Sequence, residues 1–407
     1  MIEVRAIEEE TFTPWAAQVL DTFGGDGEDQ ESLRRVHDEM EVDRSTGAYD
    51  GPLLVGTTSS LLAPLTLPWG TVGRLSAVSA VTVRSTHRRR GILTQLMRRQ
   101  LTEFHERGEL LAGLWASEAP IYGRFGYGLG TFSAGLRIRR HESTFRRPLG
   151  VENVVEVDKE TAQQVLPALQ AAAAPGHPGF LVRSEKHWKD AMGDPPAWRH
   201  GASRYRFVLH QGPSAPDGYA CYRTRHSWGS DGERQSKLEV LELHALNPDA
   251  YATLWRYCLD VDLYVEVEAW HRSVDEPLRH LLRDPRALGT RTGDGLWVRL
   301  VDVAPALAQR RYACAGELVL QIEDDFCPWN EGRVLLAAGA GETKAVATDR
   351  EPDLVLDAAA LAALYLGANR AVTLHRAGRI EERKAGALQR CDLLFAADAT
   401  PWCPTGF

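Results

Sequence analysis

The chain has 407 residues, of which 44% are hydrophobic and 25% are charged. This composition is typical of a globular protein, and the length exceeds what one ordinary core needs, so we expect two or three domains. Because the formal net charge is −8, we do not expect general binding to nucleic acid, and a cationic substrate is favoured.

The N-terminal part of the chain, through about Arg140, alternates helix and strand patterns. The patterns predict a helix at Glu31–Met40, strands at Gly51–Ser59 and Val78–Val83, a helix at Ile92–Arg107 and a strand at Leu110–Ser117. Leu61–Trp69 holds two prolines, which predicts a broken or edge strand. Gly108 stands where a helix C-cap glycine belongs. Strand, loop, helix and strand with short connections indicate a βαβ-type unit and an α/β fold.

The rest of the chain divides into two further segments. From about His141 to Gly289 we expect strands near Phe207–Leu209, Gly218–Arg223, Leu238–Ala245 and Leu263–Val267, a helix at Pro248–Leu259 and a polar hairpin tip at Ser227–Ser236. From about Gly295 we expect strands at Leu296–Leu300 and Leu318–Ile322, a helix at Asp357–Tyr365, an apolar stretch at Leu388–Phe395 and an aromatic tail at Pro401–Phe407.

Several kinds of site and segment are not expected. The six cysteines form no C-x-x-C pair, so we expect no metal site and assign them as reduced core residues. Met1–Trp15 lacks the basic start and apolar run of a secretory leader. No stretch approaches the roughly 18 uncharged apolar residues of a membrane helix. We therefore expect a cytoplasmic protein with no membrane partner.

The segment Val78–Leu93 carries the clearest chemistry. A hydrophobic strand ends in a basic loop that leads directly into the N-terminus of a helix, where free N–H groups and the helix dipole form an anion site. Arg88, Arg89 and Arg90 add cationic donors. Gly91 lets the backbone approach a diphosphate. These parts suit the pyrophosphate of coenzyme A, although a solvated turn is the commoner explanation of three consecutive arginines.

Two motifs in this region resemble known families. Arg88-x-x-Gly91-x-Leu93 after a V-x-V strand resembles the acetyl-CoA signature R-x-x-G-x-[GA] of the GNAT acyltransferase superfamily, with Leu93 in place of the usual small residue. THRRRGIL (86–93) together with SEAPIYGRFGYG (117–128) resembles the Eis family, named for enhanced intracellular survival, in which a bulky residue at that position is usual. LYLGANRA (364–371), DGLWVRLVDVAPALAQRRY (294–312) and the terminal Phe407 extend the resemblance over nearly the whole chain.

The resemblance implies a fold and an assembly. It implies a GNAT catalytic domain at 1–140, a second GNAT-like domain without a cofactor loop at 141–290, and a sterol-carrier-protein-like α/β domain at 291–407. It also implies acetyl-CoA as cosubstrate, no metal, and a homo-oligomer, namely a hexamer. We find no second R-x-x-G-x pattern at a suitable strand–helix junction in the middle segment.

The resemblance also assigns residues of the cofactor site and the general acid. The backbone of Val81, Thr82 and Val83 is expected to hold the pantetheine and the thioester carbonyl. The residues expected around the pyrophosphate are Arg88, Arg89, Arg90, Gly91, Ile92, Leu93 and Thr94, with Ser117 and Glu118 as a further contact. Tyr122 matches the general acid, and a phenol with a pKa of about 10 is protonated at neutral pH. We expect the neighbouring Phe125 and Tyr127 to form an aromatic core.

The general base implied by the resemblance is the terminal carboxylate of Phe407. Termini are normally mobile, but Trp402, Pro404 and Phe407 are apolar or stiff. Such a carboxylate has an ordinary pKa of about 3.3–3.7 and needs burial to act as a base. Gly406 departs from the acidic residue of better-known relatives, which weakens any transfer of substrate specificity.

The substrate stays open between several alternatives. Asp26 and Glu28 are candidate substrate-binding residues that could attract a polyamine, although a solvated acidic loop is the commoner reading of each. We expect acetyl transfer by direct attack in a ternary complex to amines of small polycations such as aminoglycosides. The alternatives are a protein-lysine or polyamine acetyltransferase, and a non-catalytic scaffold that binds an apolar ligand or coenzyme A.

Overall fold

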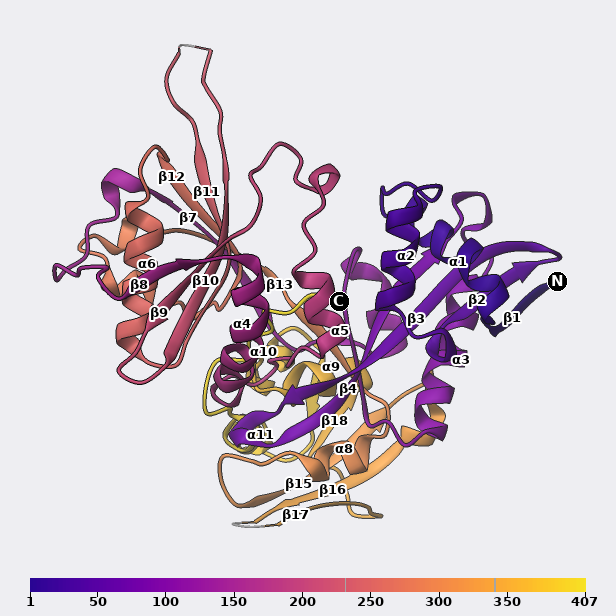
Figure 1. Ribbon diagram of the computed structural model, residues 1–407. Helices are drawn as coiled ribbons and strands as arrows, with labels where there is room; N and C mark the ends of the chain where they lie inside the picture. The colour runs from indigo at the N-terminus through magenta and orange to yellow at the C-terminus, as the bar shows by residue number, and fades with distance from the viewer. Residues whose placement is uncertain (231, 340–341) are drawn as a thin grey trace. The chain divides into compact units, whose positions relative to one another are not determined.

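The computed structural model describes residues 1–230, 232–339 and 342–407, which form three β-sheets covered by helices (Figure 1). The chain divides into two compact units. The first unit contains 1–131, 296–401 and 406–407, and the second contains 132–295 and 402–405. A mixed α/β fold is confirmed.

The first sheet lies in the first unit and has seven strands. Ala48 and Val55 pack against α3, whereas Tyr49 and Leu54, one residue along each strand, pack with α1 and α2. This alternation follows from the two-residue period of a strand and places helices on both faces. In sheet order the strands are β1 (Ile2–Ala6), β2 (Thr46–Asp50), β3 (Leu53–Thr66), β4 (Val72–Val83), β5 (Leu111–Trp115), β14 (Leu296–Leu300) and β6 (Gly128–Leu129), and the helices are α1 (Glu9–Thr22), α2 (Gln30–Glu39) and α3 (Ile92–Glu106).

The predicted βαβ-type unit is confirmed by β4, α3 and β5. Gly108, which follows α3 as expected, is left-handed. Of the two forms predicted for Leu61–Trp69, a broken or an edge strand, the structure has the second: β3 runs without interruption through Pro64 and ends at Thr66. The β2 register stops at Thr58, so Pro64 pairs with β4 alone. Proline has no N–H to donate, but no strand pairs with β3 on the other side of Pro64, so no ladder hydrogen bond is lost there.

The second sheet, in the second unit, also has seven strands with helices on both faces. Val208 and Tyr222 pack with α6, while Phe207 and Cys221 pack with α4. In sheet order the strands are β13 (Gly289–Asp294), β7 (Phe132–Arg139), β12 (Glu266–Arg272), β11 (Lys237–Ala245), β10 (Pro216–Arg225), β9 (Arg206–Gln211) and β8 (Val154–Val157), and the helices are α4 (Lys159–Ala173), α5 (Glu185–Ala191), α6 (Pro248–Asp260) and α7 (Leu278–Leu281). The predicted strand at Leu263–Val267 begins too early, because Leu263 has a φ of 75°.

One strand, β14, lies in a sheet that the order of the chain does not predict. β14 follows the whole second sheet in sequence, yet it is paired between β5 and β6 of the first sheet. The second sheet, in contrast, consists of the consecutive strands β7 to β13, although β7, the first of them in sequence, is paired between β12 and β13. The boundaries at 140 and 290 remain a prediction.

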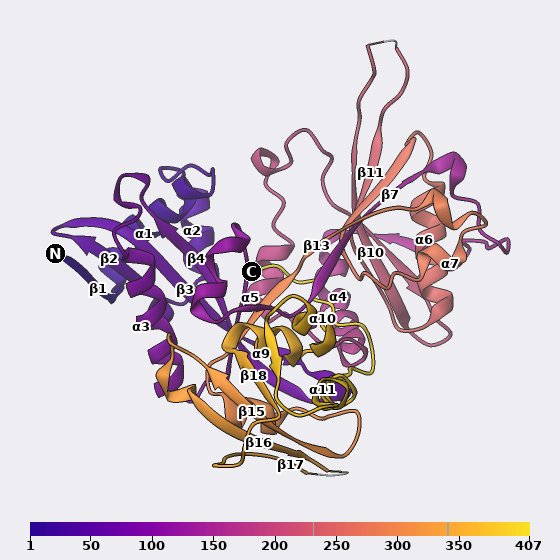
Figure 2. The same ribbon diagram turned by 180° about the vertical axis from the view of Figure 1, so that it is seen from behind.

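The third sheet belongs to the first unit and has five strands, with β15, β16 and β17 side by side (Figure 2). Its main helix, α9, is buried along its whole length, as an Ala/Leu composition allows. In sheet order the strands are β17 (Thr343–Ala347), β16 (Gly332–Ala338), β15 (Gly316–Glu323), β18 (Leu354–Asp357) and β19 (Ile380–Glu382), and the helices are α8 (Val303–Gln309), α9 (Ala358–Tyr365), α10 (Ala371–Arg376) and α11 (Ala387–Phe395). The predicted hairpin tip Ser227–Ser236 includes residue 231, which lies outside the described residues.

Candidate active site

The candidate site lies where β4 and β5 separate. These parallel strands pair only at Ser76 and Ala77 of β4. Further along, the pairing of β3 with β4 shifts register and Ala80 takes a φ of 54°. The Thr57 hydroxyl donates to the Ala80 carbonyl at 2.7 Å and fixes this bulge. Because neither neighbouring strand pairs with the backbone of Val81, that backbone is available to a ligand.

A cavity of about 290 Å³ occupies this separation and is called the β4–β5 cavity below. Its wall combines strand residues, the helices α1 and α2, and the end of the chain. The lining residues are Val19, Phe23, Val36, Glu39, Met40, Val78, Ser79, Ala80, Val81, Leu114, Trp115, Ser117, Tyr122 and Phe407. Predicted residues from the cofactor strand, the general acid and the general base therefore line one space.

Tyr122 lies in the wall of the β4–β5 cavity with only 5% of its surface exposed. Burial, together with the negative charge of Glu118, raises the pKa of its phenol to about 12. A group with this pKa stays protonated at neutral pH and can donate a proton. Phe125 and Tyr127 are buried in the adjacent apolar cluster, as expected.

Phe407, the last residue, lies in the same wall. Thr405 is buried, whereas Gly406 is exposed with no atom near its Cβ direction. Ser117 also lines the β4–β5 cavity, and Glu118 follows on the exposed surface.

The loop before α3 has the features of an anion site. No side chain caps the N-terminus of α3, whereas Asp29 caps α2 and Asp357 caps α9. Gly91, at the N-cap, has a φ of 76° and open space in its Cβ direction. The N–H groups of the first helical turn are therefore accessible to an acceptor from outside the protein.

The arginines of this loop differ in their partners. Arg88, Arg89 and Arg90 are all exposed. Arg90 donates to Asp50 at 2.9 Å, while within the described part of the chain Arg88 and Arg89 have no carboxylate partner. The guanidinium groups of Arg88 and Arg89 are therefore available for phosphate oxygens, to which their geometry is suited.

Two other predicted cofactor residues have side chains that serve the fold. The Thr82 hydroxyl is buried and forms hydrogen bonds with the side chains of Thr57 and Gln18. The Ile92 side chain is 1% exposed and packs with Val55. Any contact of these residues with a cofactor must therefore be made by their backbone. Val83, Leu93 and Thr94 are half-buried.

The predicted substrate-binding residues Asp26 and Glu28 are exposed and are not among the residues that line the β4–β5 cavity. Glu39, at the end of α2, lies in the wall of that cavity, as does the next residue, Met40. Glu39 was not among the predicted site residues; the signal that could have indicated it is its place as an acidic residue near the end of the helix predicted at Glu31–Met40.

The second sheet lacks an equivalent loop. β11 ends at Ala245 and α6 begins at Pro248, so the connection is very short. The Asn247 side chain accepts a hydrogen bond from the N–H of Ala250 at 2.9 Å and so caps α6. The first turn of α6 therefore differs from that of α3, which no side chain caps.

Within the described residues, no group of three or more His, Cys, Asp or Glu side chains is arranged to hold a metal ion. In the same part of the chain, no helix is both long and apolar enough to cross a bilayer.

Comparison with known proteins defines the class of the chain. The acetyltransferase (GNAT) domain matches residues 3–130 and, in a second form, residues 179–300, and the sterol carrier protein domain matches residues 303–404. The chain thus consists of two GNAT domains followed by a sterol-carrier-like domain. Together with the uncapped helix N-terminus and the β4–β5 cavity, these matches define an N-acetyltransferase of the GNAT superfamily.

The relatives identify the family within this class. An uncharacterised N-acetyltransferase of Streptomyces coelicolor is 38% identical over all of both chains. The N-acetyltransferase Eis of Mycobacterium tuberculosis is 34% identical over 86% of this chain and 85% of its own. The crystal structure of Eis1 from Mycobacterium abscessus, 33% identical, superposes over all of both chains with a TM-score of 0.86. The chain belongs to the Eis family of N-acetyltransferases.

Proposed function

We propose that the protein transfers the acetyl group of acetyl-CoA to an amine of a small polycation, such as an aminoglycoside, by direct attack in a ternary complex. One observation carries this proposal: Tyr122 and Phe407, from distant parts of the chain, line the cavity where β4 and β5 separate. A scaffold that only binds a ligand has no use for a protonated phenol and a terminal carboxylate at one opening.

Each group of the site has a role in this reaction. Acetyl-CoA supplies the acetyl group as a thioester. The first turn of α3, Arg88 and Arg89 bind its pyrophosphate, and the free backbone at Val81 aligns the pantetheine beside the β4–β5 cavity. The carboxylate of Phe407 accepts the proton that the attacking nitrogen loses. Tyr122 donates its proton to the departing sulfur, so the products are an amide and a neutral thiol.

A second candidate substrate class is favoured by the size of the site. A cavity of about 290 Å³ lies at the lower end of the roughly 300–1,000 Å³ range of small-molecule sites. Its mostly apolar wall with Glu39 at one position matches a slender amine, such as a polyamine or a lysine side chain. An aminoglycoside fits if one amine enters and its rings remain outside.

A thiol-release assay with acetyl-CoA tests both substrate classes. The amines are aminoglycosides of two and three rings, spermidine and a lysine peptide, and the control without amine gives the rate of hydrolysis. We expect kcat/KM to be highest for a compound with several amines. Binding of acetyl-CoA without thiol release on any amine would instead support the non-catalytic scaffold.

Three further features belong to the proposal through the family resemblance. We infer a homohexamer, a cytoplasmic location, and domain limits near residues 140 and 290. Analytical ultracentrifugation of the full chain measures the first, and limited proteolysis locates the limits, since cleavage concentrates at exposed segments between domains.

A further inference from the structure

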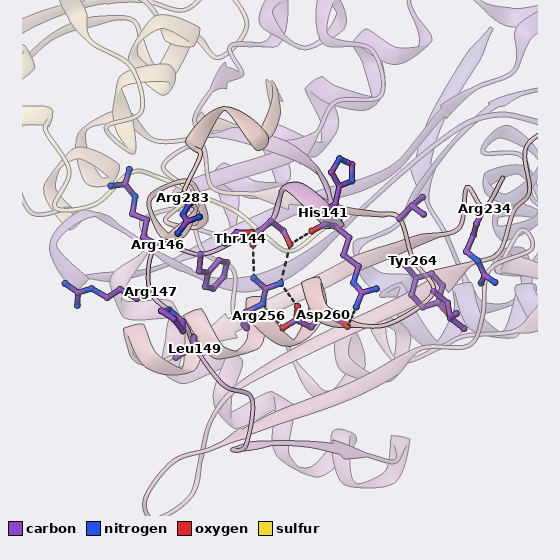
Figure 3. Close-up of a pocket in the computed structure, with 16 residues that line it drawn as sticks. His141, Thr144, Arg146, Arg147, Leu149, Arg234, Arg256, Asp260, Tyr264 and Arg283 are labelled. Atoms are coloured by element: carbon purple, nitrogen blue, oxygen red, sulfur yellow. Dashed lines mark hydrogen bonds and ion pairs between the residues drawn. The ribbon is translucent and has the colours of Figure 1, made fainter.

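A second and larger cavity lies in the second unit, and none of the residues assigned to acetyl transfer lines it. It measures about 790 Å³ and is called the arginine pocket (Figure 3). Its charged lining consists of six arginines and one aspartate, with one histidine. These residues are Arg140, His141, Arg146, Arg147, Arg234, Arg256, Asp260 and Arg283. The protein as a whole has a net charge of −8, so this local excess of positive charge opposes the average.

Some of these arginines are already neutralised by the protein. Arg256 donates to both carboxylate oxygens of Asp260, at 2.7 and 2.6 Å, and to the carbonyl of Ser143. Arg140 donates to Asp262 and to the carbonyl of Asp260. These two guanidinium groups balance the acidic end of α6 and hold the floor of the arginine pocket in place.

Other arginines keep donors for an incoming group. The Nε–H of Arg146 donates to the carbonyl of Leu282. In the part of the chain that the structure describes, its two terminal nitrogens have no carboxylate partner. Within the described residues, Arg147 and Arg283 have no side-chain hydrogen bond or ion pair. In Figure 3 these three arginines lie on one side of the Arg256–Asp260 pair. Like charges around one concavity repel each other, and an anion bound between them removes that cost.

The arginine pocket also has an apolar wall. Phe145 and Tyr264 are largely buried, whereas Leu149 is 38% and Leu263 is 56% exposed beside them. The volume lies within the roughly 300–1,000 Å³ of small-molecule sites. Guanidinium forks match the oxygens of phosphate groups, and the exposed leucines match an apolar portion of the same ligand.

We propose that the arginine pocket binds a phosphate-bearing small molecule. This site is separate in kind from the cofactor loop, because it lies at the C-terminal end of α6, whereas the cofactor loop precedes a helix N-terminus. The N-terminus of α6 is closed by Asn247. The inference therefore does not depend on the proposed acetyl transfer. The volume of the arginine pocket and the net negative charge of the protein favour a small anion over nucleic acid.

Isothermal titration of the full chain with sodium tripolyphosphate tests the proposal. The variant is Arg147→Gln/Arg283→Gln, and the matched control is Arg286→Gln/Arg376→Gln, which removes the same charge from two exposed arginines outside the pocket. The cofactor loop offers a second place for polyphosphate, so the measured quantity is the difference between wild type and variant. We expect the variant to lose one bound equivalent, or to bind it about 100-fold more weakly, as two charge-assisted hydrogen bonds predict.

Two companion measurements complete the experiment. Circular dichroism melting shows whether the variants fold, and Arg147→Lys/Arg283→Lys, which keeps the charge but not the forked donors, should bind with intermediate affinity. Equal loss in the control pair would overturn the proposal, as it would reflect overall charge. Undiminished binding in the Gln variant, or binding of a single-stranded oligonucleotide through these arginines with none of tripolyphosphate, would overturn it too.

Discussion

Tyr122 and the terminal residue Phe407 line the same cavity of about 290 Å³. The phenol lies after β5 and is held by the aromatic cluster around it. The carboxylate, in contrast, belongs to a segment with exposed Gly406 immediately before it. The proposed proton donor is thus buried in a packed cluster, whereas the proposed proton acceptor follows an exposed glycine.

Replacing Tyr122 by Phe removes the proposed general acid and little volume. We expect kcat to fall about 100-fold, the lower end of what general acid catalysis contributes, with unchanged binding of acetyl-CoA. Tyr127→Phe is the matched control, because the Tyr127 hydroxyl is buried without a hydrogen-bond partner. Steady-state kinetics and titration of acetyl-CoA measure both effects. Equal turnover of the two variants would exclude Tyr122 as the acid.

The raised pKa of Tyr122 also predicts a pH profile. With a pKa of about 12, caused first by burial and then by Glu118, the phenol stays protonated across the alkaline range of an ordinary assay. We expect no alkaline fall of kcat between about pH 8 and 10, since deprotonation of a general acid is what produces one. A kcat that declines with an apparent pKa near 9 would mean that another group donates the proton.

Extending the chain by two glycines after Phe407 moves the terminal carboxylate. We expect a loss of kcat of about 100-fold, because a general base must lie within hydrogen-bonding reach of its proton. Two glycines placed before Met1, which is fully exposed, form the control and should leave activity unchanged. Wild-type turnover by the C-terminal extension would remove Phe407 from the mechanism.

Comparing Gly91→Ala with Gly108→Ala separates the role of the cofactor loop in binding acetyl-CoA from the effect of either substitution on stability. Both are left-handed, with φ of 76° and 68°, and both have open space where a Cβ would stand. Replacing either by Ala should cost a similar 1 kcal/mol or so of stability. Only Gly91→Ala should raise the KM for acetyl-CoA, since Gly91 precedes the uncapped turn of α3. An equal KM in both variants would contradict the proposed anion site.

Glu109 predicts how the first unit responds to acid. Burial alone would raise its pKa, but hydrogen bonds from Arg44 and Ser76 lower it overall from 4.5. Because the folded pKa lies below the unfolded one, this carboxylate adds stability above about pH 4.5 and loses it as the pH falls through the folded value. Glu109→Gln should therefore lower Tm at pH 7 and flatten the loss of Tm below pH 4.5. The exposed Glu106→Gln should behave like wild type.

The buried ion pair of Arg299 and Asp324 predicts how the stability of the first unit depends on a compensated buried charge. Both side chains are almost fully enclosed, at 0% and 2% exposure. Asp324→Asn should destabilise the protein by about 3 kcal/mol, since it leaves a buried charge uncompensated. Adding Arg299→Met should recover part of that loss. Chemical denaturation measures both, with the exposed Glu317→Gln as a control of under about 1 kcal/mol.

The sequence predicted local structure well and long-range assembly poorly. The strand, basic loop, helix and Gly108 were all correct, because their signals lie within neighbouring residues. The alternation of Leu296, Val298 and Leu300 correctly predicted a strand, but it states only that one face is buried and not against which sheet.

The candidate site shows the same division. The predicted anion site before α3 rests on local pattern, whereas the predicted role of Phe407 rests only on the family resemblance. Glu39 and the arginine pocket were missed, since their residues meet through folding: Arg147, Arg256 and Arg283 come from separate segments. No spacing along the chain brings such groups together.

The position of β14 has a consequence for how the protein is made. During synthesis the ribosome delivers β5 and β6 long before β14, which must be placed between them. Until residue 300 has emerged, the nascent first sheet has an unpaired edge at Leu111–Trp115, which other chains can join. The catalytic half is therefore not a separable module, because a gene fragment ending at Thr131 lacks the strand that closes its sheet.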